Sequence, residues 1–130
     1  MKQIASAAGV LAALALPGPA SADDGLTYQD LVHCAATNVV VASILSMDGG
    51  EKRNKADIAL ARNQATALMT IAQQGSKKNI DVVHTDVTRE SDVVMASLDD
   101  KAKGDAFYAS DVPKCSNLGD AAIAVVNKPK

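Results

Sequence analysis

Two copies of one short pattern combine residue types that bind metal ions. Asp30 precedes His33 by three residues, and Asp81 precedes His84 in the same way. Residues three apart share one face of a helix, and paired carboxylate-x-x-histidine motifs form metal sites inside some helical bundles. If the two segments run parallel and side by side, the four side chains meet at one level. One interpretation is therefore a metal site at Asp30, His33, Asp81 and His84.

A solvated surface is the competing interpretation of these residues. Acidic residues near a helix start are stabilised by the helix dipole whatever their function, and both histidines lie beside the apolar positions rather than among them. Carboxylate-bridged dimetal bundles also need further glutamates, and the two in this chain, Glu51 and Glu90, are placed elsewhere. We therefore expect no cofactor, and we keep the metal site as the alternative.

The two cysteines, Cys34 and Cys115, are the only thiols in the chain. An even number of cysteines in a small exported protein predicts a disulfide. The eleven residues from 104 to 114 can reach back to Cys34, because an extended chain spans roughly 3.3 Å per residue. A redox-active pair is the alternative, but the Cys-x-x-Cys spacing typical of such pairs is absent. We predict a structural Cys34–Cys115 disulfide.

Other catalytic signatures are missing from the sequence. It contains no Cys-x-x-Cys-His for covalent haem, no Gly-x-Ser-x-Gly elbow and no phosphate-binding glycine loop. Serine, histidine and aspartate are present, but their spacing marks no triad. We therefore expect that the protein is not an enzyme.

Three long segments with a helical period must position these residues. The first opens on a capping box at Thr27 and Asp30 and ends at Gly49-Gly50. The second runs from about 51 to 74, and the third from about 77 to 103, closed by Gly104. Because the connections are short, neighbouring helices should run antiparallel, which leaves the first and third parallel.

The sequence after Gly104 lacks the long helical period of the first three segments. Val112 precedes Pro113, which disfavours helix at that point. We expect a loop through Cys115 and a short final helix starting near Asn117. The predicted fold is all-α: a small antiparallel helical bundle of three long helices plus a short C-terminal helix, tied by the disulfide.

The N-terminal 22 residues have the features of a cleaved signal peptide. Lys2 is followed by an apolar run over 4–16, two prolines, and the small-residue sequence Ala20-Ser21-Ala22. The alternative is a membrane anchor, but a spanning helix needs roughly 20 apolar residues, and the run over 4–16 is shorter than that. We predict cleavage after Ala22, a single helical domain over 23–130, and a periplasmic or secreted location with no membrane contact after cleavage.

Composition excludes several classes of partner. Without Lys2, 12 basic and 15 acidic residues leave a net charge of −3. Nucleic acid needs a basic surface, and base stacking needs more aromatic residues than Tyr28, Phe107 and Tyr108. We expect a non-enzymatic protein-interaction or stress-related module whose partner is another periplasmic protein. Small helical acid-stress chaperones with one disulfide share these general features with the chain, but no sequence motif links it to them. The alternative is a small-ligand or metal carrier that uses the bundle interior or the four Asp and His residues. The sequence does not specify the oligomeric state.

Overall fold

A computed structural model describes residues 26–128, and every regular element in that range is helical. The predicted signal peptide, residues 1–22, lies outside the described residues. The all-α fold and its disulfide are confirmed. In chain order the elements are α4 (Tyr28–Ser46), η1 (Met47–Gly49), α5 (Gly50–Arg53), α6 (Lys55–Ser76), α7 (Ile80–Ser97), α8 (Lys101–Ala106), the π-helix η2 (Phe107–Asp111) and α9 (Val112–Val126).

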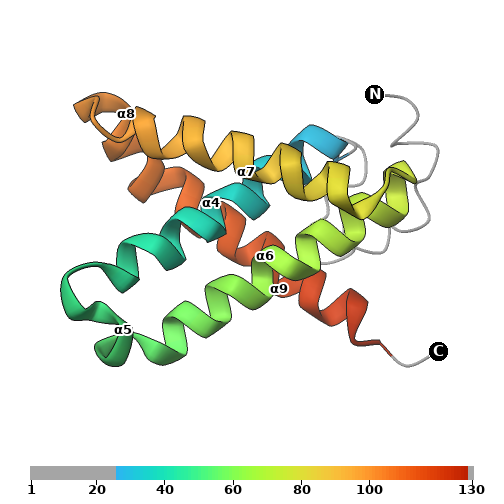
Figure 1. The fold of residues 1–130 in the computed structure, drawn as a ribbon, viewed down its shortest axis with the longest axis horizontal. Helices are drawn as coiled ribbons and strands as arrows, with labels where there is room; N and C mark the ends of the chain where they lie inside the picture. The colour runs from blue at the N-terminus through green and yellow to red at the C-terminus, as the bar shows by residue number, and fades with distance from the viewer. Residues whose placement is uncertain (1–25, 129–130) are drawn as a thin grey trace.

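Helix α4 is the centre of the bundle. It packs against α6, α7 and α9, and α9 crosses behind α4 and α6 in Figure 1. Because three helices cover it, α4 buries residues on most of its circumference, namely Leu31, Val32, Cys34, Ala35, Ala36, Thr37, Asn38, Val40 and Ala42. The segment Tyr28–Arg53 is long and apolar enough to cross a membrane by length and composition, but half of its most apolar window is buried inside the fold. Its apolar character is thus accounted for by the core.

Both ends of α4 form as their residue types predict. Thr27 Oγ1 accepts a hydrogen bond from the Asp30 N–H at 3.1 Å, and Asp30 Oδ2 accepts one from the Thr27 N–H at 2.9 Å. At the other end the backbone turns through Gly49, which has φ 76°. Gly50 then lies against the Leu45 carbonyl, where a Cβ atom would clash with the oxygen. The glycine pair therefore allows the tight reversal into α6.

The third predicted helix is divided in two. Helix α7 ends at Ser97, and the chain turns over Leu98–Asp100 before α8 begins. Asp100 caps α8, because its carboxylate accepts a hydrogen bond from the Lys103 N–H at 3.0 Å. Gly104, expected to stop the helix, is instead buried within α8. The Asp100 cap thus starts a new helix in which Gly104 is accommodated.

The loop expected through Cys115 is helical instead. Val112 has φ −61° and ψ −52°, which is helical geometry, and α9 begins there rather than near Asn117. Pro113 lacks an N–H and its ring crowds the carbonyl four residues back. The preceding turn is widened into the π-helix, where the Val112 N–H donates to the Phe107 carbonyl five residues back. This wider turn accommodates the proline near the start of α9 without breaking the chain direction.

The disulfide joins the two helices at the core. Cys34 on α4 and Cys115 on α9 are both buried, with Cα atoms 4.8 Å apart. A buried amide supports the junction, since Asn38 Nδ2 donates to the Cys115 carbonyl at 3.3 Å. From α6, Gln64 Nε2 donates to Asp120 Oδ1 at 2.8 Å. These contacts fix α9 on the bundle beside the predicted Cys34–Cys115 disulfide.

Candidate functional site

Helices α4 and α7 lie side by side and parallel, but their register differs from the one expected. Tyr28 Oη donates to Asp86 Oδ2 at 2.6 Å, a pair 58 residues apart, and His33 contacts Glu90, a pair 57 residues apart. The two Asp-x-x-His motifs are only 51 residues apart. They are therefore offset by six or seven residues, about 10 Å along a helix.

Because of this offset, the two Asp-x-x-His motifs do not lie at the same level, as the predicted metal site requires. Asp81 and His84 lie level with the beginning of α4 or beyond it, and both are exposed on α7. Asp30 belongs to the cap of α4. Within residues 26–128, no group of three or more His, Cys, Asp or Glu side chains is arranged to hold a metal ion. The structure therefore does not bring Asp30, His33, Asp81 and His84 together.

His33 has two carboxylate neighbours that the sequence did not indicate. Its Nδ1 lies 2.8 Å from Glu90 Oε2 on α7, and its Nε2 lies 3.8 Å from Asp111 Oδ2 at the end of η2. The first distance is a hydrogen bond and the second is too long for one. His33 thus lies where α4, α7 and η2 meet.

A cavity of about 230 Å³ opens beside this junction, and we call it the His33 pocket. Val93, Val94 and Phe107 form an apolar wall. Ionisable groups on four different elements also line it, namely His33, Glu90, Lys103 and Asp111. An apolar wall with a few convergent polar groups is typical of binding sites.

The hydroxyl and imidazole groups of the His33 pocket are engaged in hydrogen bonds. A serine nucleophile needs a base within hydrogen-bonding reach, but the Ser97 hydroxyl, which also lines the pocket, donates to the Val94 carbonyl at 2.7 Å. The imidazole in turn is hydrogen bonded through Nδ1 to Glu90. The pocket therefore presents charged and apolar groups without an activated nucleophile among the residues that line it.

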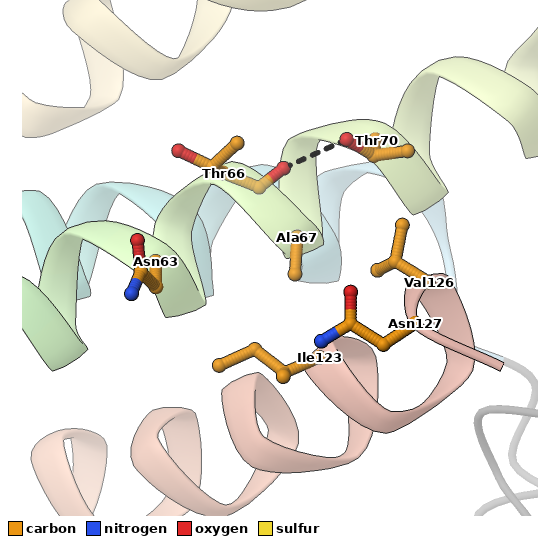
Figure 2. Close-up of a pocket in the computed structure, with 7 residues that line it drawn as sticks. All are labelled: Asn63, Thr66, Ala67, Thr70, Ile123, Val126 and Asn127. Carbon is orange, nitrogen blue, oxygen red and sulfur yellow. Dashed lines mark hydrogen bonds between the residues drawn. The ribbon is translucent and has the colours of Figure 1, made fainter.

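A second cavity, of about 240 Å³, lies between α6 and α9, and we call it the α6–α9 groove. Figure 2 shows side chains of the two helices facing one another across it, with Ala67 on α6 opposite Ile123 and Val126 on α9. Its remaining lining is uncharged, namely Asn63, Thr66, Thr70 and Asn127. The Thr70 hydroxyl is already engaged, because it donates to the Thr66 carbonyl at 3.0 Å. The groove suits a small uncharged molecule.

A third group of polar side chains fastens the start of α4 to α7. Burial, together with the hydrogen bond from its hydroxyl to the negatively charged Asp86, raises the pKa of Tyr28 well above its ordinary value. Lys78 Nζ lies 4.0 Å from the centre of the Tyr28 ring and 3.9 Å from Asp86 Oδ2. Arg89 adds a 3.2 Å contact to Asp86. These contacts join the start of α4 to α7 and to the residues before it.

We compared the chain with models of known protein families, with curated proteins and with solved structures, and none of them matches it. The roles of individual residues are therefore inferred from the contacts above.

Proposed function

We propose that the chain is an exported, non-enzymatic helical module that binds another protein in the periplasm or outside the cell. The observation that carries this proposal is the side chain of Val93, which is 58% exposed at the edge of the His33 pocket. It is the most exposed large hydrophobic side chain among residues 26–128. Binding energy at a protein interface comes from a few residues that become buried in well-packed pockets, and an exposed apolar side chain beside a cavity can be buried by a partner in this way.

Support for export comes from the buried disulfide and the N-terminal sequence. Disulfides persist in oxidising compartments and are rare in the cytosol, and Cys34–Cys115 is shielded from solvent. Residues 1–22 carry the features of a signal peptide.

The interaction is tested with two matched variants of α7. Val93→Asp places a charge beside the His33 pocket, and Val82→Asp makes the same change at a valine that is 45% exposed on the same helix, 11 residues away. The exported wild-type protein is used to capture partners from its own compartment, and we expect the V93D variant to lose a partner that V82D retains. If V93D retains every partner, the surface is wrongly assigned.

The stress-related form of this proposal has its own test. A chaperone activated by acid should lose tertiary structure near pH 2–3 and then suppress the aggregation of a model client. Hydrogen exchange and light scattering at that pH measure the two properties. A protein that keeps native protection there would rule out the acid-stress role while leaving protein binding at neutral pH intact.

The second candidate function is a small-ligand carrier, and the α6–α9 groove favours it. Its apolar floor and its amide and hydroxyl rim suit a small uncharged molecule. A ligand that binds only the folded state raises the unfolding temperature. We expect such a gain from a matching ligand, and Thr66→Trp should abolish it because the exposed Thr66 lines the groove. A gain of the same size in T66W would place the ligand elsewhere.

A further inference from the structure

We propose that the gap between His33 Nε2 and Asp111 Oδ2 binds a primary ammonium group carried on a short aliphatic chain, which lies along the apolar wall of the His33 pocket. This inference rests on the proposed binding role of that pocket. It adds the chemical class of the group that the pocket recognises.

The hydrogen bond on the far side of the imidazole determines which group can enter the gap. An ionised carboxylate only accepts hydrogen bonds, so the 2.8 Å contact with Glu90 places the proton of His33 on Nδ1. In the neutral imidazole the other nitrogen, Nε2, is then an acceptor. It faces Asp111 Oδ2, a second acceptor, at 3.8 Å. Two acceptors at this separation leave room for a donor that bonds to both.

The size of the gap fits a nitrogen donor. Charged N–H···O hydrogen bonds are about 2.7–2.9 Å long. A nitrogen about 2.8 Å from each acceptor can bridge them, because half of the 3.8 Å separation is less than this bond length. A metal ion is not supported at this gap, because among residues 26–128 no group of three or more His, Cys, Asp or Glu side chains is arranged to hold one. An ammonium group also carries three donors, one more than the bridge uses.

The charge and shape of the pocket agree with an alkylammonium ligand. Two carboxylates, Glu90 and Asp111, face one cation, Lys103, so that with a neutral imidazole the lining is net negative. The apolar wall of Val93 and Phe107 can cover a chain of a few methylene groups in the 230 Å³ cavity. Such a group occurs on a lysine side chain and on a free alkylamine, and the two sources share this chemistry.

The test uses the full mature protein at pH 8, above the ordinary pKa of a histidine side chain in a model peptide. The probe is n-butylammonium, with n-butanol as the uncharged control, and the readout is the imidazole ¹⁵N signals in NMR spectra. We expect a saturable shift of His33 with the amine and none with the alcohol. His84, exposed on α7 away from the pocket, is the internal control. Absence of a saturable His33 shift would overturn the proposal.

Three variants identify the groups that hold the ammonium. Asp111→Asn keeps the shape and removes the charge, and we expect binding at least tenfold weaker. Asp105→Asn is the matched control, because Asp105 is exposed and paired with Lys101 rather than with the pocket. Lys103→Gln removes the competing cation from an exposed position and should tighten binding severalfold. Equal affinities in D111N and D105N would refute the site, whatever the effect of K103Q.

A second ligand separates the two sources of the ammonium group. N-acetyl-lysine-N-methylamide presents the same group as a protein side chain does. If it binds more tightly than n-butylammonium, the natural ligand is a lysine of a partner; if it binds more weakly, a free amine is indicated. The amine site fails alone when V93D loses a partner but no amine binds. The protein-binding proposal fails alone when the amine binds but V93D retains every partner.

Discussion

Tyr28 shows how one side chain at the edge of the core is held by its surroundings. Its hydroxyl donates to Asp86 at 2.6 Å, and Lys78 covers the ring. Burial and the neighbouring carboxylate both disfavour the negatively charged tyrosinate, so the pKa of Tyr28 is raised. The unfolded value lies near 10. The resulting contribution to the free energy of unfolding is therefore fully present below about pH 10 and is lost as the pH rises above it.

This leads to a prediction for alkaline solution. In a Tyr108→Phe variant, Tyr28 is the only tyrosine of the chain. We expect the absorbance of its tyrosinate near 295 nm to appear well above pH 10 in the folded protein. Asp86→Asn should lower that pH in the same background, whereas Asp92→Asn, an exposed position on the same helix, should not. Ordinary titration of Tyr28 in the folded Y108F protein would contradict the contact with Asp86.

A second residue-scale prediction concerns Gly119 of α9. A Cβ atom there would lie 2.6 Å from Gln64 Cβ and 2.8 Å from Gln64 Cγ. Since Gln64 Cβ is fixed by its own backbone, α6 and α9 would have to separate. We expect Gly119→Ala to lower the free energy of unfolding by about 1–3 kcal/mol, measured by denaturant unfolding. The control is Gly104→Ala, where a Cβ atom would lie 3.3 Å from the Leu98 carbonyl oxygen; an equal loss there would point to a general helix effect.

At the scale of the elements, the disulfide decides how firmly α9 is attached. Cys34 and Cys115 close a loop of 81 residues, and a loop of that length is worth about 4.5 kcal/mol in the chain-entropy model. We expect Cys34→Ala/Cys115→Ala to lose a free energy of unfolding of about this size. Either single substitution should lose a similar amount, because each removes the same bond. Hydrogen exchange should accelerate in α9; an unchanged denaturation midpoint would contradict this role.

Several elements could be predicted because their signals are local. Thr27 and Asp30 form the expected capping box, and the glycine pair after α4 makes the expected reversal. The helix break predicted before Pro113 was wrong, because the free-energy cost of a proline in a helix depends on the geometry of the preceding turn. That turn is a π-helix, and no short sequence motif predicts it. Cys115 was therefore expected in a loop, although its partner was correctly identified.

The site was harder to predict than the fold because it depends on register. His33 was singled out from its residue type, but its contacts with Glu90 and Asp111 depend on how α4 and α7 slide along each other. Polar residues at similar spacings on the two helices were the available signal. Tyr28 and His33 are five apart, while Asp86 and Glu90 are four apart. Parallel helices with these pairs in contact would have placed Glu90, rather than His84, beside His33.

At the scale of the whole molecule, export and oxidation should leave a measurable mass. We expect the protein recovered from its native compartment to begin at Asp23 and to weigh about 2 Da less than the fully reduced chain, because Cys34–Cys115 formation removes two hydrogens. Intact mass spectrometry before and after reduction checks both points. Denatured protein without reductant should show no free thiol; two thiols, or a retained Met1, would contradict the export proposal.

The central position of α4 has a consequence for how the chain is made. This helix comes first among the described elements, while α9, which covers one of its sides and carries the partner of Cys34, comes last. During synthesis, the apolar side chains of α4 that α9 covers stay exposed to water until α9 has been made. An incomplete chain that ends before α9 would expose this surface and be prone to aggregate. Among the described residues, α4 thus depends on the last helix, α9, to cover its apolar surface.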